Sequence, residues 1–156
     1  RQEEDMVKQA SEFAGTVPVR HLLPYWKTSN RYLFSGGSVN MRDAAVYAKE
    51  ENWSKAVELW KQTYETKKGK QKMYAAYNTA LGYEMQDSID TALEWALKAQ
   101  TLAREKSKTD KKETGEIHDG TISYYIFISM YVDELEKRKE GMARLNMQMN
   151  RFDDDF

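Results

Sequence analysis

The residues of this chain that could do chemistry are few and far apart. Its two histidines are His21, in an extended segment beside Arg20, and His118, in the polar stretch EIHDG. A metal site needs two or three ligands that converge on rigid elements, and neither histidine offers that in sequence. The chain has no Cys, which excludes disulfides, thiolate catalysis and zinc ribbons. We therefore predict no metal site and no cofactor.

Motifs for catalysis are missing as well. Carboxylates are plentiful, but pairs such as Glu50 and Glu51 are typical of solvated helix faces, and nothing singles out an acid–base couple. The stretch SGGS at residues 35–38 lacks the lysine and the spacing of a phosphate-binding loop. No serine has the setting of a nucleophile elbow. We predict that the protein is not an enzyme.

The charge pattern argues against nucleic acid as a partner. Lys plus Arg is 24 and Asp plus Glu is 25, so the net charge is −1. Two Lys-rich segments, 67–72 and 106–112, lack the interleaved aromatic or Arg residues that stack on bases, and we interpret both as solvated turns. The most apolar window, residues 122–132, is shorter than the roughly 18 residues of a membrane helix. Because the chain starts at Arg1 without a signal region, we expect a processed or trimmed piece of a longer protein.

The middle of the chain contains an internal repeat. Ala44 recurs as Ala80, 36 positions later, and Tyr47 recurs as Tyr83. Small residues allow two helices to approach closely, and large ones beside them fill the space left over. The signature of the two copies consists of Ala44, Tyr47, Trp53 and Ala56, and of Ala80, Tyr83, Ala92 and Ala99. Short polar turns, with Asn52 as an N-cap candidate, predict helices over 38–51, 53–67, 72–86 and 89–105.

The stretch from Gly37 to Glu105 resembles two tetratricopeptide repeats. The family's usual period is about 34 residues, so a spacing of 36 implies a longer turn between the copies. The resemblance implies an all-α fold of antiparallel helix-turn-helix repeats with extra N-terminal and C-terminal capping helices. Such repeats host many functions, so the resemblance says more about the fold than about the activity.

The flanks should cover the apolar faces of so short a repeat array. In residues 1–36 we expect a helix with Met6 and Phe13 on one face, then an extended stretch, then a helix from Pro24 that carries residues 26–34. A capping helix is predicted over 121–140 and ended by Gly141. In the segment that follows, Met142, Leu145, Met149 and Phe152 stand at helical spacing, and residues 153–156 are expected to be a frayed tail. The predicted organisation is an N-terminal extension packed on the repeats (1–36), two repeats (37–106), a mobile polar linker (107–120) and a C-terminal capping helix and tail (121–156). The motif VPVR…LPYW resembles segments of bacterial envelope lipoproteins, which favours a periplasmic or envelope location.

The resemblance implies a concave groove lined by the first helix of each copy. Some relatives in the repeat family clamp a peptide's terminal carboxylate with Lys and Asn, but Met41 and Ala45 stand at those positions here. An apolar groove suits an amphipathic helix or an extended segment. In the alternative, the chain's own flanks fill the groove and its residues are core. The groove residues are Met41, Ala45, Lys49, Tyr74, Tyr77, Leu81, Glu84 and Met85.

These observations predict a scaffold that binds a protein or peptide partner, or another domain of its own longer chain, and they leave a homodimer open. One alternative is a structural domain of an envelope lipoprotein with no separate ligand. Another is a module that binds carbohydrate or small molecules, because exposed Trp side chains stack on sugar rings. The candidates for that stacking are Trp26, Trp60 and Trp95.

Overall fold

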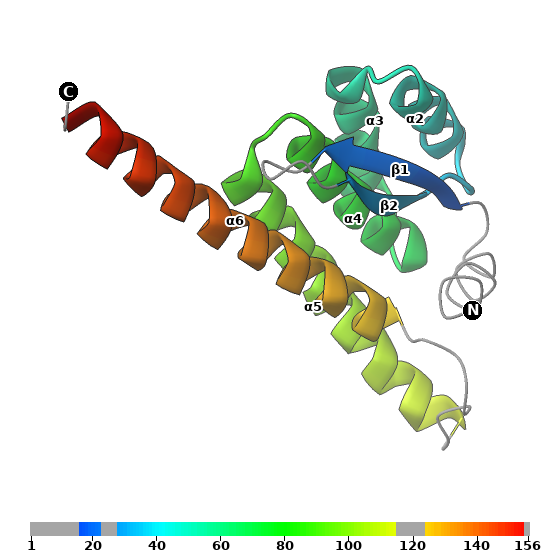
Figure 1. The fold of residues 1–156 in the computed structure, drawn as a ribbon. Helices are drawn as coiled ribbons and strands as arrows, with labels where there is room; N and C mark the ends of the chain where they lie inside the picture. The colour runs from blue at the N-terminus through cyan, green and yellow to red at the C-terminus, as the bar shows by residue number, and fades with distance from the viewer. Residues whose placement is uncertain (1–15, 23–27, 115–123, 155–156) are drawn as a thin grey trace.

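The computed structural model describes residues 16–22, 28–114 and 124–154, and helices dominate these ranges. The prediction of an all-α fold is confirmed, and the one sheet within these ranges is a two-stranded antiparallel hairpin (Figure 1). The elements in chain order are β1 (Thr16–Leu22), β2 (Thr28–Phe34), α2 (Val39–Lys49), α3 (Trp53–Thr66), α4 (Lys70–Met85), α5 (Ile89–Thr114) and α6 (Tyr124–Asp154).

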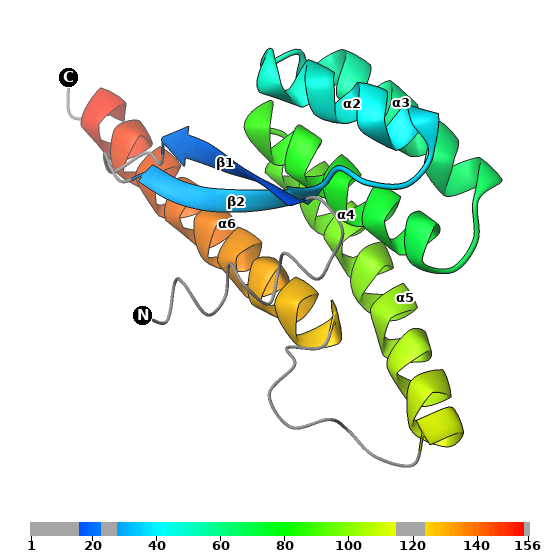
Figure 2. The ribbon, with the colours of Figure 1, turned by 90° about the vertical axis from the view of Figure 1, so that its right-hand side faces the viewer.

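The helices form a row in which each packs on the next along the chain, and α6 runs back along α5. The hairpin lies across α4, between α6 and α2, with β2 as the strand that contacts both α4 and α2 (Figure 2). Helix α4 is therefore surrounded by α3, α5 and β2. Its buried residues cover nearly all sides of the helix, which places it at the centre of the core.

The turns after α2 and α4 repeat each other in detail. Glu51 and Asp87 both adopt a left-handed backbone, with φ of 60° and 61°. In the first turn the backbone N–H of Asn52 donates to the carbonyl of Tyr47, and Ser88 donates to Tyr83 in the second. This is the Schellman ending of a helix, and its residues recur 36 positions apart in the two turns. The side chain of Asn52 also caps α3 through the backbone N–H of Lys55.

Small side chains bring the helices close together in the core. The Ala members of the repeat signature are fully buried, and Trp60 on α3 fills the space beside them. Gly82 lies where α4 crosses α3, and a Cβ at that position would stand 2.4 Å from Val57 Cγ2 and 3.2 Å from Trp60 Cζ3. A side chain larger than glycine cannot be placed there unless the side chain of Val57, or α3 with it, shifts.

Two alanine substitutions are expected to have opposite effects on stability. Gly82→Ala should lower the free energy of unfolding by about 1–3 kcal/mol, since overpacking outweighs the gain in helix propensity. Gly141→Ala should raise it by about 0.5–1 kcal/mol, because nothing lies within 4 Å of that Cβ and the residue is inside α6. Urea denaturation of both variants measures this. A stabilised Gly82→Ala would contradict the close crossing.

The last two helices are longer than predicted. Residues 107–114 of the predicted linker, and with them all of the Lys-rich segment 106–112, belong to α5. This segment lacks Gly and Pro up to Gly115 and is rich in helix-forming Lys and Glu. Gly141 does not end the capping helix, because a single glycine costs a helix only about 1 kcal/mol and good helix formers follow it. Helix α6 starts at Tyr124 and includes part of the predicted tail, to Asp154.

The helix predicted over residues 26–34 is wrong. Residues 28–34 form β2, paired with β1 in a register that joins Thr16 to Phe34 and Leu22 to Thr28. Side chains that favour strands, in the run Tyr32-Leu33-Phe34, and the binding of this strand by α4 outweigh the helix start at Pro24. The N-terminal helix predicted around Met6 and Phe13 lies outside the described residues.

Candidate functional site

The predicted groove residues on α4 are covered by other parts of the chain. Tyr74, Tyr77, Leu81 and Glu84 are at most 5% exposed, and on α2 Met41 and Ala45 are buried as well. Lys49 is exposed and Met85 is half-buried. The groove is therefore filled, as in the alternative in which the flanks supply its cover. Strand β2 and the N-terminal half of α6 are the covering elements.

Phe34 at the end of β2 is the centre of an aromatic cluster. Its ring stacks on Tyr74 of α4 with 4.1 Å between the centroids, and it meets the edge of Tyr77 at 5.2 Å. Helix α6 adds Phe127 and Tyr124 at 6.1 and 6.4 Å. Stacked and edge-to-face aromatic pairs each contribute about 0.5–1.5 kcal/mol beyond the area they bury. Phe34 is thus a buried anchor between two helices that lie far from it in sequence.

Helix α4 also binds the backbone of β2. The Asn78 side chain accepts from the backbone N–H of Phe34 at 2.9 Å and donates to its carbonyl at 2.6 Å. The Tyr77 hydroxyl donates to the carbonyl of Tyr32. Residues 32 and 34 present their N–H and C=O groups to the same edge of the strand, since successive residues alternate. Two adjacent helix residues therefore pair with three backbone groups on the edge of β2 that β1 leaves open.

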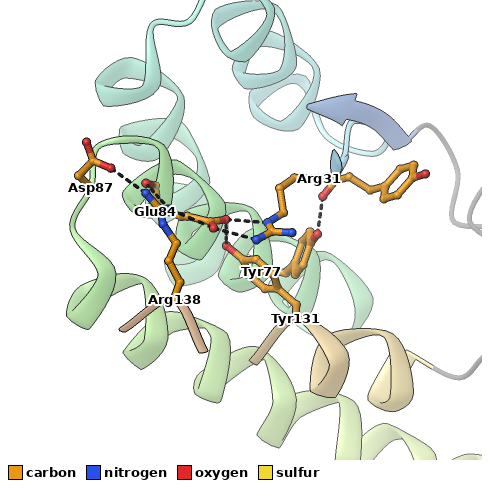
Figure 3. Close-up of polar contacts among 7 residues, drawn as sticks. Arg31, Tyr77, Glu84, Asp87, Tyr131 and Arg138 are labelled. Atoms are coloured by element: carbon orange, nitrogen blue, oxygen red, sulfur yellow. Dashed lines mark hydrogen bonds and ion pairs between the residues drawn. The ribbon is translucent and has the colours of Figure 1, made fainter. Parts of the chain in front are cut away.

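Glu84 is the polar centre beneath this strand (Figure 3). Its carboxylate is fully buried and accepts two hydrogen bonds from Arg31 of β2, Nε to Oε1 at 3.0 Å and Nη2 to Oε2 at 3.1 Å. Tyr131 of α6 donates to Oε1 at 2.9 Å, and Arg138 donates from Nη1 to Oε2 at 3.2 Å. Arg138 also reaches Asp87 at 2.8 Å. One carboxylate thus ties β2, α4 and α6 together.

The charges in this network hold one another ionised. Burial alone would raise the pKa of Glu84, but hydrogen bonds and positive charge from Arg31 and Arg138, with the Tyr131 hydroxyl, keep that pKa below its usual value. Burial opposes the charge of Arg31, yet Glu84 keeps the pKa of Arg31 above its usual value. Burial beside Glu84 raises the pKa of the Tyr131 hydroxyl well above its usual value. Glu84, Arg31 and Tyr131 therefore each keep one protonation state at neutral pH, which suits a fixed clamp rather than proton transfer.

The other predicted sites are not assembled by the fold. Trp60 is fully buried, and Trp95 meets Tyr64 edge-on at 81°, so these side chains do not form the coplanar exposed pair that sugar stacking needs. Trp26 and His118 lie outside the described residues. Within the described ranges, no three His, Cys, Asp or Glu side chains gather where a metal ion could bind. In the same ranges, every helix is too short or too polar to cross a membrane.

Four residues of this site were not singled out by sequence reasoning. Arg31 and Asn78 carry the contact between β2 and α4, and Tyr131 and Arg138 join α6 to it. One signal was available for Arg138, which continues the buried face of α6 three positions after Leu135. An Arg on an otherwise apolar face indicates a buried acidic partner. No comparable signal marked Asn78, a short polar residue inside a helix.

Comparison with known protein families divides the chain at the end of the hairpin. Residues 42–137 match the family described as domain of unknown function DUF6340, and residues 1–34 match the one described as domain of unknown function DUF8603. No curated protein and no solved structure matches the chain. The two matched segments meet at the site, since Arg31 comes from the first and Glu84 and Tyr131 come from the second.

Proposed function

The chain belongs to the DUF6340 family. We propose that its helical body, which consists of α2 to α5, is a non-enzymatic interaction scaffold. This scaffold is similar to tetratricopeptide repeats and binds an extended protein segment. The segment it binds here is β2 of the same chain. The backbone clamp of Tyr77 and Asn78 on β2 is the observation that carries this proposal. The turns that recur at a spacing of 36 residues support the likeness to the repeat family.

The contacts divide into a general part and a selective part. Hydrogen bonds to the carbonyl of Tyr32 and to both backbone groups of Phe34 would accept an extended segment of many sequences. The buried carboxylate of Glu84 selects an Arg, because leaving this charge without a partner is costly. The aromatic cluster selects a ring three residues later, where Phe34 lies. The groove therefore favours a segment with the pattern Arg-x-x-Phe, in which position 33 is also buried.

Burial of the groove favours a second candidate function. If β2 never leaves α4, the body is a structural block that joins the segment matched by DUF8603 to α6, with no separate ligand. A location in the bacterial envelope would agree with either candidate, and the resemblance of residues 17–26 to lipoprotein segments is its basis. The two candidates differ in whether the groove can bind a segment added from solution.

A peptide added to the full chain separates the two candidates. Phe34→Ala should weaken the docking of β2 by about 3–5 kcal/mol, since it removes the central ring of the cluster. A fluorescent peptide with the sequence of residues 28–36 should then bind this variant at least about tenfold more tightly than the native chain, whose own strand competes at a high local concentration. Fluorescence anisotropy measures both affinities.

The control peptide carries Glu in place of Arg31, and it should not bind because it brings a second negative charge to Glu84. Circular dichroism of Phe34→Ala verifies that the helices remain folded, and Phe34→Leu serves as the milder variant if they do not. Equal binding of both peptides would contradict a selective groove. Failure of the native-sequence peptide to bind either folded variant would favour the structural block.

A further inference from the structure

The C-terminal part of α6 extends beyond the rest of the molecule. Up to Arg138 the helix has a buried face, and after Met142 every residue to Asp153 is exposed. Figure 1 shows this part of the helix projecting away from α5 and the hairpin. The projecting part still carries large apolar side chains. Leu145 is 42% exposed, Met149 58% and Phe152 64%.

The apolar side chains of the projecting part continue the buried face of the same helix. Residues 128, 131, 135 and 138 are buried against the body, and their spacings alternate between three and four. The same alternation leads on to 142, 145, 149 and 152 without a break. A repeat of three and four is the heptad spacing of a coiled coil, whose seam faces another helix. The apolar stripe of α6 is defined here as Met142, Leu145, Met149 and Phe152.

We propose that the apolar stripe of α6 pairs with the same stripe of a second copy of this chain, the two helices lying antiparallel. The stripe is continuous with an interface already formed in the fold, since the first half of α6 packs on the rest of the chain through the same heptad positions, residues 128, 131, 135 and 138. Helix α6 is anchored there, so its projecting part is preformed and less ordering opposes the association.

The residues that flank the stripe favour a second copy as the partner. In an antiparallel pair the e positions of the two helices lie beside each other, and so do the g positions. The central flanking residues are Asn146 and Gln148, which are uncharged and can hydrogen-bond to their own copies. At the ends, Lys139 of one copy would lie near Asp153 of the other. Like charges do not meet along this seam.

The body and the acidic end of the helix favour the antiparallel direction. A parallel pair would place the two bodies side by side at one end, where α5 and the hairpin already occupy the seam of α6. It would also place Asp153 of both copies at the same end of the pair. An antiparallel pair centred near residue 147 puts the bodies at opposite ends and separates the acidic ends.

The size of the stripe sets the strength of the dimer. Four side chains from each copy would bury on the order of 1,000 Å² in total, which is at the lower limit of specific interfaces. The expected association is therefore in the micromolar range. It is an interaction separate from the groove on α4, because the stripe and β2 lie on different parts of the chain.

Two methionines of α6 provide a matched test. Met147 and Met149 are each 58% exposed, but only Met149 belongs to the stripe, and Met147 is at the heptad position that faces away from the seam. Sedimentation velocity of the full chain over a range of concentrations measures the dimer. Met149→Asp should weaken dimerisation by about tenfold or more, and Met147→Asp should leave it unchanged. Leu145→Asp should act as Met149→Asp does.

The direction of the pair can be measured because the native chain has no Cys. A spin label on Asp133→Cys would be separated from its counterpart by roughly 40 Å in the antiparallel dimer, at 1.5 Å of rise per residue on both sides of residue 147. A distance of about 20 Å or less would overturn the antiparallel arrangement. A native chain that stays monomeric at 1 mM, or equal effects of the two methionine substitutions, would overturn the dimer itself.

Discussion

Replacing Glu84 with glutamine is expected to lower the free energy of unfolding by about 3–5 kcal/mol, because it leaves two buried guanidinium groups without their shared negative charge. Arg31 and Arg138 are 6% and 5% exposed, so water cannot replace the lost carboxylate. Urea denaturation followed by circular dichroism measures this loss. Few substitutions of one polar side chain by another reach this size.

Glu94→Gln is the matched control, since Glu94 is an exposed glutamate on the neighbouring helix α5. Its effect should stay within about 0.5 kcal/mol. A double variant provides an internal check. Arg31→Met added to Glu84→Gln should cost less than the sum of the two single substitutions, because it removes one of the cations that Glu84→Gln leaves unpaired. Additive losses would mean that Arg31 and Glu84 do not interact.

The pH dependence of stability follows from the direction of the pKa of Glu84. Its pKa is lower in the folded chain than in the unfolded chain, so the folded state favours the ionised carboxylate. The stabilisation is fully present above the unfolded-state pKa of about 4.3 and is lost as the pH falls through the lower folded-state value. The native chain should therefore lose more stability below about pH 4 than Glu84→Gln does.

Local sequence patterns predict an element correctly where its own residues decide its structure. The helices α2 to α4 begin and end within two residues of the predicted bounds, because capping residues and apolar spacing act locally. The predicted end of α6 at Gly141 is wrong, because a residue that often ends helices lies inside one there. Whether a helix ends at a glycine depends on a small difference between the cost of the glycine and the helix propensity of the residues around it. The position of the glycine alone therefore does not predict the end of the helix.

The site itself depends on contacts between distant parts of the chain. Glu84 was placed on the groove face, but its role depends on Arg31, 53 residues earlier, and on Arg138, 54 residues later. Residues 28–34 were predicted as a helix because the strand is stabilised mainly by what it touches, namely β1 on one edge and α4 on the other. No local pattern contains that information. The two alternatives for the groove could be stated from the sequence, and only the packing of β2 decides between them.

Asn78→Ala is expected to cost about 2–4 kcal/mol of stability, because the N–H and the carbonyl of Phe34 would both remain buried without their partner. The damage should be local to the strand. Hydrogen exchange at the backbone amide of Phe34 should become faster by at least about tenfold, while the amides in the middle of α3 keep most of their protection. Mass spectrometry of peptic fragments measures both regions in one experiment.

Two other variants assign the effect to the backbone clamp. Asn40→Ala removes an asparagine whose side chain donates to Gln62 at the surface, so it should change stability by less than about 0.5 kcal/mol. Asn78→Asp keeps an acceptor for the N–H of Phe34 but cannot donate to its carbonyl, and it brings a charge into a buried position. It should therefore be no more stable than Asn78→Ala. If Asn78→Ala leaves exchange at Phe34 unchanged, β2 is held by its side chains alone, and the groove does not bind an extended backbone.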